Sequence, residues 1–243
     1  MQRQIFIEAL LPTLFTLPFM IVFTKDKSHF KNLGLFVIIF ISHQVIVRLP
    51  MQYKWLQITD GEWNWTGKFF GIIFGILVYI IIRKKISPYD FIKIKQEQQY
   101  IQKTIIATIL ITCIAFFSYF DSSMKMDGET LLYQLTMPGL DEEILFRAVL
   151  LGLLLKCLKK NIKIGQFNLG SPSVLIIGLL FGLLHGLTLT DEFNLKFDSL
   201  YFLSTFVFGY VWSWITLKSE SILQPVISHN VSNFVIYLIR MTK

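Results

Sequence analysis

Eight long apolar runs constrain the fold of this chain more than any other feature of its sequence. Hydrophobic residues make up 53% of the 243 residues and charged residues only 16%, against about a quarter in soluble domains. A run of about 20 apolar residues can cross a bilayer, and in hydrocarbon it satisfies its backbone groups only as a helix. We therefore expect an all-α fold, a polytopic membrane bundle of about eight transmembrane helices. Their approximate bounds are 5–24, 33–49, 66–82, 103–120, 130–158, 173–190, 199–217 and 221–239.

The basic residues indicate how these helices are oriented. The 23 lysines and arginines give the chain a net charge of +7, but they cluster in short connections between apolar runs, which favours contact with anionic lipid over nucleic acid. The odd-numbered connections hold most of them, notably 83–103 and 156–163. By the positive-inside rule these connections face the cytoplasm and both termini face outward. We expect a multi-pass protein of a cell membrane, with the lipid bilayer as a partner.

Two segments need a separate interpretation. The first run has a signal-like character, but no small-x-small cleavage site follows it, so we expect an uncleaved transmembrane helix. The segment 83–103 could form a basic helix on the inner leaflet or a solvated loop, and the sequence leaves both open.

The fifth run contains DEEILFR, residues 141–147, in a place where charge is costly. A charged side chain at the centre of a membrane helix costs about 2.5–3.5 kcal/mol on insertion scales, so it usually faces a cavity and a partner. Glu143 and Arg147 are four residues apart on one helix face, in the favourable order for an ion pair. Glu142 lies about 100° around the helix and can point elsewhere. One glutamate can thus be neutralised while the other addresses a site.

The start of this helix can be placed from its neighbours. Pro138 and Gly139 are expected to break the helix or to begin it, which would place the glutamates in a first turn, where the helix dipole favours negative charge. Asp141 then has the position of a helix cap, outside the chemistry.

Two later runs carry polar side chains at a similar depth. FGLLHG places His185 four residues after Phe181, and HNVSN places Asn233 four residues after His229. At 1.5 Å per residue, His185 and Glu143 lie roughly 18 Å into their runs and His229 roughly 12 Å. Three helices therefore present polar groups near the middle of the bilayer. We interpret this convergence as a polar intramembrane cavity formed by the later helices.

Other polar and small residues have simpler interpretations. His43 is expected to form a hydrogen bond between helices, and Phe181 to pack beside His185. Glycines four residues apart in the sixth run should allow close helix packing; they are Gly178, Gly182 and Gly186. Asp191 and Glu192 are expected in a solvated loop.

A carboxylate and imidazoles around a sequestered water form a hydrolytic arrangement. Glutamate can take a proton from the water, histidine can orient it, and histidine and asparagine can stabilise an oxyanion. Glutamate with two histidines is also a legitimate zinc ligand set. HExxH is absent, and the two cysteines show no metal-binding spacing. Spacing alone does not decide between the two mechanisms.

The three motifs together resemble those of a known family. EEILFR fits EExxxR, FGLLH fits FxxxH and HNVSN fits HxxxN, in this order on successive late helices. This resembles the CPBP family (CAAX protease and bacteriocin-processing, also called Abi) of intramembrane endopeptidases, over roughly residues 103–240. The resemblance divides one compact membrane domain into N-terminal helices without recognised motifs, 1–102, and a CPBP-like catalytic core, 103–243.

The resemblance also implies roles for individual residues. Glu142 resembles the glutamate that activates water and His185 the residue that positions it. Glu143 resembles the carboxylate held by Arg147, while His229 and Asn233 resemble the pair that stabilises the oxyanion. The family implies a mechanism without a cofactor, with zinc as the alternative.

Composition suggests what such an enzyme would cleave. The abundance of Ile, Lys, Phe and Asn hints at a low-GC bacterium, whose plasma membrane would hold the protein and whose proteins are not prenylated. A membrane-associated peptide or protein, such as a bacteriocin or signalling-peptide precursor, is then the expected substrate. Two other functions stay open: a non-catalytic bacteriocin-immunity or regulatory scaffold, and a proton-relaying transporter. The transporter is disfavoured because the polar motifs occur only in the second half of the chain.

Overall fold

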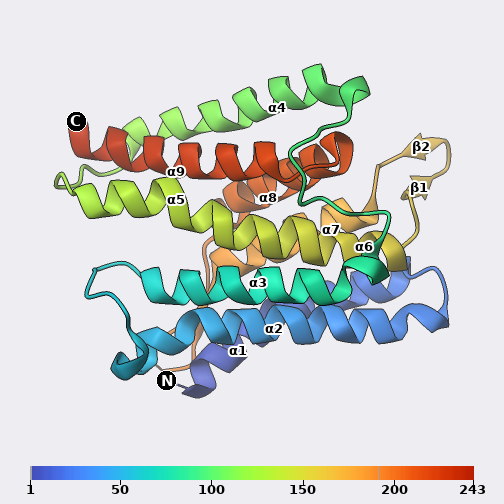
Figure 1. The fold of residues 1–243 in the computed structure, drawn as a ribbon, viewed down its shortest axis with the longest axis horizontal. Helices are drawn as coiled ribbons and strands as arrows, with labels where there is room; N and C mark the ends of the chain where they lie inside the picture. Colours follow the sequence, from blue (N-terminus) through green and yellow to red (C-terminus); the bar gives the residue numbers. More distant parts are fainter. Residues whose placement is uncertain (1, 191) are drawn as a thin grey trace.

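The computed structural model describes residues 2–190 and 192–243, in which helices run side by side along one axis (Figure 1). Each predicted apolar run corresponds to one helical segment, and the all-α class is confirmed. The fourth segment ends as a 3-10 helix, η4, and the fifth is joined by a π-helix, η5. The segments are α1 (Gln2–Phe23), α2 (Phe30–Gln52), α3 (Trp65–Ile86), α4 (Ile101–Cys113) with η4 (Ile114–Phe120), α5 (Gly128–Glu143) with η5 (Ile144–Leu150) and α6 (Leu151–Cys157), α7 (Pro172–Gly186), α8 (Ser199–Ser219) and α9 (Leu223–Thr242).

The helices confirm a multi-pass membrane protein. Within the described residues, five helices are long and apolar enough to cross a membrane: Gln4–Phe23, Lys27–Gln52, Trp65–Ile86, Gln98–Phe120 and Ser199–Ser219. The segment formed by α5, η5 and α6 is longer than these five but carries the charges of DEEILFR, and α7 is shorter, with 15 residues. The helices that carry the three motifs thus all lie outside this set of five: α7 is apolar but short, whereas α5 and α9 are less apolar.

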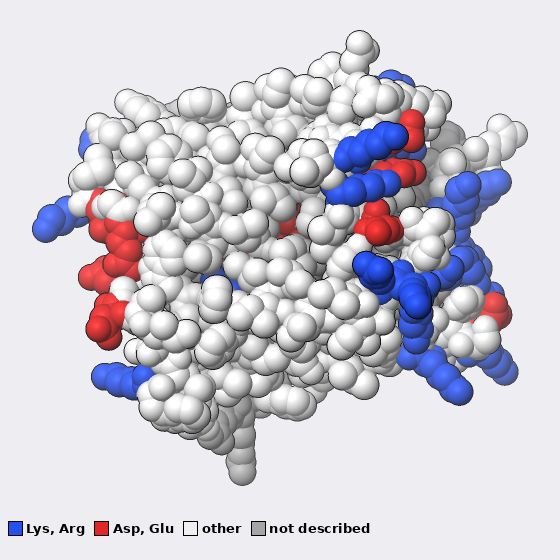
Figure 2. Space-filling model, in the orientation of Figure 1, with Lys and Arg blue, Asp and Glu red and all other residues white. Residues whose placement is uncertain are grey.

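The two ends of the bundle differ in charge. The start of α1 and the end of α9 lie at one end of the bundle (Figure 1). Basic side chains gather at the opposite end, around the connections after α3 and α6 (Figure 2). The end of α6 contacts the connections after α1 and α3 there, since Lys25 Nζ donates to Lys156 O at 2.8 Å and Lys156 Nζ donates to Ser87 O at 2.8 Å. This asymmetry is the one on which the predicted orientation rests.

Short non-helical elements cover the ends of the bundle. Two antiparallel hairpins are formed by β1 (Lys163–Ile164) with β2 (Phe167–Asn168) and by β3 (Leu187–Leu189) with β4 (Leu195–Phe197). The predicted extent of the sixth run, to residue 190, is wrong: α7 ends at Gly186, and Leu187 becomes extended because Gly186 O accepts a bond from Asp198 N of the returning chain. Asp191, expected in a solvated loop, lies outside the described residues, and Glu192 is exposed as expected.

The connection between α3 and α4 resolves one open alternative. The chain from Ser87 to Glu97 forms no helix, and only the short 3-10 turn Gln98–Tyr100 precedes α4. The segment is therefore a loop rather than a helix lying on the leaflet.

Helix α5 begins earlier than expected and continues through its proline. It starts after Asp127, which caps it by accepting bonds from the backbone N–H groups of Glu129 and Thr130. The additional bond from the Thr130 hydroxyl helps to lower the pKa of Asp127. The prediction that Pro138 and Gly139 begin or break the helix is therefore wrong.

The interruption at Pro138 is satisfied by a neighbouring helix. Proline removes one backbone donor and disturbs the hydrogen bonds of the preceding turn. Asn230 of α9 compensates, because its Oδ1 accepts from Gly139 N at 2.8 Å and its Nδ2 donates to Thr136 O at 3.2 Å. The glutamates consequently stand in the middle of the continuous segment formed by α5, η5 and α6, so the predicted support from the dipole of a first turn is absent.

The predicted close packing of α7 is confirmed. Side chains built on its glycines would meet atoms of α8: Tyr210 at Gly178, Phe206 and Phe202 at Gly182, and Phe202 at Gly186. Small residues let two membrane helices approach closely and gain dispersion contacts along their length.

We predict that Gly186→Ala destabilises the protein and Gly34→Ala does not. A Cβ at Gly186 would lie 2.8 Å from Phe202 Cα and 2.9 Å from its N, which are backbone atoms that cannot move aside. Overpacking of this kind costs about 1–3 kcal/mol. At Gly34 of α2 a Cβ meets nothing within 4 Å, so alanine should be neutral or stabilising there. Thermal unfolding in detergent measures both, and equal midpoints would contradict the packing argument.

Candidate active site

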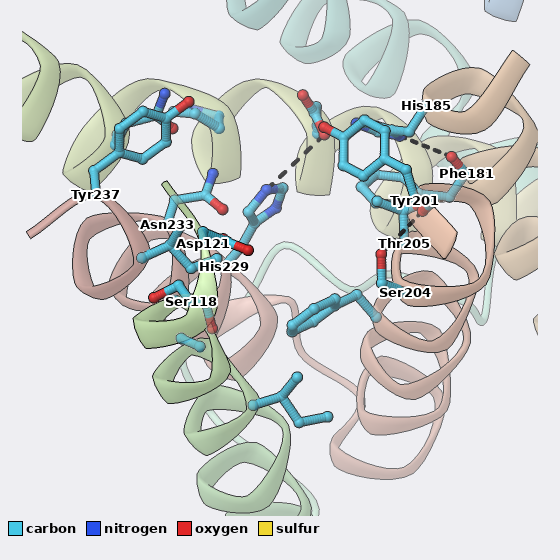
Figure 3. Close-up of a pocket in the computed structure, with 18 of the residues that line it drawn as sticks. Ser118, Asp121, Phe181, His185, Tyr201, Ser204, Thr205, His229, Asn233 and Tyr237 are labelled. Carbon is cyan, nitrogen blue, oxygen red and sulfur yellow. Dashed lines mark hydrogen bonds and ion pairs between the residues drawn. The ribbon is translucent and has the colours of Figure 1, made fainter. Parts of the chain in front are cut away.

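The candidate site is a half-open cavity of about 710 Å³ that is lined by six elements. Its lining comes from α3 and the residues just before it, η4, α5, α7, α8 and α9. Of the six predicted site residues, four line it: Glu142, His185, His229 and Asn233. Figure 3 shows His185, His229 and Asn233 around one space, carried by α7 and α9. The remaining two, Glu143 and Arg147, are fully buried behind this wall.

Glu142 is the acid of DEEILFR that faces the cavity. Its side chain is 14% exposed, whereas those of Asp141 and Glu143 are 0% exposed. One carboxylate oxygen, Oε1, accepts a bond from Lys68 Nζ at 2.6 Å. The other, Oε2, lies 4.0 Å from His229 Nε2 and has no hydrogen-bond partner among the described residues. Within the described part of the chain, this second oxygen is buried and unpaired at the wall of the cavity that Glu142 lines.

Glu143 is held from two sides, as the spacing of the motif predicts for Arg147. Its Oε2 lies 3.0 Å from Arg147 Nε, and its Oε1 lies 2.9 Å from His229 Nδ1. Both partners are buried, so this carboxylate is a structural anion that links η5 and α9.

The Arg147 guanidinium is embedded in aromatic rings. Its Cζ lies 4.7 Å from the ring centre of Phe181, 5.5 Å from that of Phe146 and 5.6 Å from that of Trp212. A cation over an aromatic face gains up to about 2 kcal/mol when it is desolvated. The aromatic rings thus stabilise the part of the charge that Glu143 does not neutralise.

The orientation of His229 is fixed by its neighbours. A carboxylate accepts hydrogen bonds, so the contact with Glu143 places a proton on Nδ1 and leaves Nε2 toward Glu142. The ring stacks on Trp212 with centres 4.3 Å apart, and Trp212 Nε1 donates to Ser228 Oγ at 3.0 Å. The imidazole is therefore clamped, with one nitrogen available to the cavity.

His185 is oriented by the backbone of its own helix. A carbonyl only accepts, so His185 Nδ1 carries the proton that is donated to Phe181 O at 2.8 Å. In the neutral ring Nε2 then carries a lone pair. Phe181 packs against the ring at 4.5 Å, as expected, and also lies beneath Arg147. The FxxxH spacing thus joins the arginine site to the histidine.

Three polar residues that the motifs do not include complete the surroundings of Glu142. Asp141 is neither a helix cap nor exposed: it is buried, with Oδ1 2.7 Å from His43 Nε2 and Oδ2 2.8 Å from Lys68 Nζ. His43 forms the expected bond between helices. Lys68 was missed as a site residue. A lysine three residues inside an apolar run was the available signal, since it requires a partner.

The arrangement of possible ligand side chains can be compared with what a zinc site requires. Within residues 2–190 and 192–243, no three His, Cys, Asp or Glu side chains are grouped so as to hold a metal ion. In this arrangement Glu142 is bonded to Lys68, and one nitrogen of each histidine is bonded elsewhere.

We predict that Arg147→Met is strongly destabilising and that adding Glu143→Gln recovers much of the loss. Removing one partner of a buried ion pair costs about 3–5 kcal/mol because the other charge stays buried and unpaired. In the double variant the glutamine oxygen can still accept from His229. Thermal unfolding of the two single variants and the double variant measures the coupling free energy between Arg147 and Glu143. If the destabilisation of the double variant equalled the sum of the two single effects, the two residues would not act as an ion pair.

Comparison with known proteins supports the same family. Residues 129–235 match the model of the family described as type II CAAX prenyl endopeptidase Rce1-like. No curated protein and no solved structure gives a match to the chain. All six predicted site residues lie inside the matched segment, whereas His43 and Lys68 lie outside it.

The family match confirms the resemblance predicted from the three motifs. Residues 129–235 are thus similar to the type II CAAX prenyl endopeptidase Rce1-like family, which agrees with the resemblance to CPBP and CAAX-type intramembrane proteases.

Proposed function

We propose that the chain is an intramembrane endopeptidase that hydrolyses a peptide bond by means of a water activated by Glu142. One observation carries the proposal: Glu142 brings a carboxylate oxygen without a partner among the described residues to a cavity that is also lined by His185, His229 and Asn233. A carboxylate is a suitable general base when the proton it takes lies within hydrogen-bond reach.

The first step is attack of water on the substrate carbonyl. Glu142 Oε2 takes one proton of the water, while the lone pair of His185 Nε2 accepts a hydrogen bond from the other. The water oxygen forms a bond with the carbonyl carbon, and the π electrons of the carbonyl move to its oxygen. Lys68, bonded to Oε1, keeps the carboxylate turned so that Oε2 meets the water.

The second step is collapse of the tetrahedral intermediate. A protonated His229 would donate Nδ1–H to Glu143 and Nε2–H to the oxyanion, and the Asn233 amide would supply a second donor. The carbon–nitrogen bond then breaks, and the proton held by Glu142 passes to the leaving amine. The products are a free carboxyl group and a free amine, and Glu142 is again ionised.

The cavity walls favour an apolar, membrane-associated substrate. Aromatic and aliphatic side chains from three helices line them, including Phe117 of η4, Phe208 of α8 and Ile236 of α9. The family implies substrates of the CAAX type. Since the composition suggests a bacterium, we propose a bacteriocin or signalling-peptide precursor in the plasma membrane as the substrate. Zinc is not part of the proposed mechanism.

We predict that Glu142→Gln abolishes processing while the folded protein persists in the membrane. Glutamine has the same shape but cannot take the proton, and loss of a general base lowers rates by about 10²–10⁴-fold. The measurement compares membrane and secreted peptides, by mass spectrometry, between cells with the wild-type chain and cells with Glu142→Gln. Precursors should accumulate and their fragments disappear.

Glu192→Gln, at an exposed acid outside the cavity, is the matched control and should process as the wild type does. Full processing by Glu142→Gln would refute the catalytic role and leave a binding scaffold. An assay of purified protein with a chelator distinguishes the metal-independent mechanism from the zinc-dependent one. Activity that is lost with the chelator and restored by zinc would contradict the metal-independent mechanism.

A further inference from the structure

A line of buried hydrogen bonds reaches Glu142 from the first hundred residues. Arg48 Nη1 donates to Gln44 Oε1 at 2.8 Å, and Gln44 Nε2 lies 3.3 Å from His43 Nδ1. His43 Nε2 contacts Asp141 at 2.7 Å. Lys68 Nζ then bridges Asp141 and Glu142 at 2.8 and 2.6 Å. We call these five residues, Arg48, Gln44, His43, Asp141 and Lys68, the α2–α3 relay.

Both ends of the relay fix the direction of its bonds. Arginine and lysine only donate and ionised carboxylates only accept. Gln44 therefore accepts at its oxygen and donates from its amide nitrogen to His43 Nδ1, which leaves the proton of a neutral His43 on Nε2, facing Asp141. Each donor points toward Asp141 or Glu142, so the line is polarised toward the acids.

Burial makes these contacts strong. His43 and Asp141 are each 1% exposed and Gln44 is 6% exposed, while the side chain of Lys68 is 14% exposed and lines the cavity. Polar groups in such surroundings are costly unless each one is paired.

The backbone of α3 is shaped to bring Lys68 to the acids. Gly67, Gly71 and Gly75 lie four residues apart on this helix. A side chain at Gly71 would collide with the Asp141 carboxylate, and one at Gly75 would meet Ile144 at 3.0 Å. The absence of side chains at Gly71 and Gly75 lets α3 lie close to α5 and η5, whereas a Cβ at Gly67 would meet Val47 O of α2. The close approach and the lysine are parts of one arrangement.

We propose that the α2–α3 relay is a positioning device for Glu142, with Lys68 as the residue that holds its carboxylate ionised and turned toward the cavity. The proposal rests on the proposed function of Glu142. It gives the helices outside the matched segment 129–235 a part in the site. Asp141 holds Lys68 and His43 holds Asp141, so the line resists rotation of the lysine away from Glu142.

The test is carbodiimide labelling of the full chain, purified in detergent, at neutral pH. Dicyclohexylcarbodiimide reacts with protonated carboxyl groups in apolar surroundings, and fragment mass spectrometry assigns the label to Asp141, Glu142 or Glu143. Lys68→Met should speed labelling of Glu142 by about tenfold or more, because an opposite charge within ~4–6 Å strongly favours the ionised form. Labelling of Glu143 should stay unchanged, because Arg147 still holds it.

Matched variants show whether the labelling rate of Glu142 depends on the charge of Lys68 or on a general loss of folding. Lys68→Arg keeps the charge and should label as the wild type does. Lys54→Met removes an exposed lysine of the same half and should change nothing. If Lys68→Met does not fold, Lys68→Gln replaces it, with the same expected rise at Glu142. An unchanged rate at Glu142, or an equal rise at Glu142 and Glu143, would overturn the proposal.

The labelling result is independent of catalysis. If Glu142 responds to Lys68→Met but Glu142→Gln cells still process peptides, the relay stands and the proposed function fails. If Glu142→Gln abolishes processing but the labelling does not respond, the proposed function stands and the relay fails.

Discussion

Three consecutive carboxylates inside a membrane helix are the constraint on which the rest of this structure depends. An unpaired charge in hydrocarbon is costly, and adjacent like charges add their repulsion. Successive residues of a helix point about 100° apart, so Asp141, Glu142 and Glu143 face three different directions. Their partners therefore come from several parts of the bundle: Lys68 of α3 contacts both Asp141 and Glu142, His43 of α2 contacts Asp141, and Arg147 of η5 and His229 of α9 contact Glu143. The positions of α2, α3, η5 and α9 follow from the requirement for these partners.

The three acids accordingly have different surroundings. Asp141 faces α2 and α3, where His43 and Lys68 surround it. Glu143 faces Arg147 and His229 and is closed off from the cavity. Of the three, only Glu142 lines the cavity, and one of its oxygens is held by Lys68. Two acids thus fix the structure around the third, and local π-helical geometry at η5 adapts the helix to this crowding.

Much of this arrangement could be predicted from the sequence because it depends on period and composition. The apolar runs predicted the helices, and the i,i+4 spacing predicted the contact between Glu143 and Arg147. Similar depth in separate runs indicated that Glu142, His185, His229 and Asn233 meet in one cavity. These properties are local to a helix or set by the thickness of the bilayer.

The rest depends on contacts between distant segments. Lys68 meets Glu142 across 74 positions of the chain, and only the rotation and close approach of α3 bring them together. Pro138 predicts a helix break when only its own segment is considered, because Asn230, whose side chain satisfies the backbone groups around the proline, belongs to another helix. The extended β3 depends on a returning strand. A single sequence does not specify how helices rotate against each other, so these features could not be derived from it.

The division of labour among the three acids is the central claim, and thermal unfolding of their amide variants tests it most directly. Asp141→Asn, Glu142→Gln and Glu143→Gln each remove one charge without changing shape. The account predicts that the first and third lower the unfolding midpoint in detergent. Asp141→Asn weakens two buried contacts, to His43 and Lys68, and Glu143→Gln leaves the buried Arg147 without its anion. Glu142→Gln should leave the midpoint close to that of the wild type, because Lys68 stays paired with Asp141. A midpoint lowered most by Glu142→Gln would contradict the account, since Glu142 would then be a structural anion.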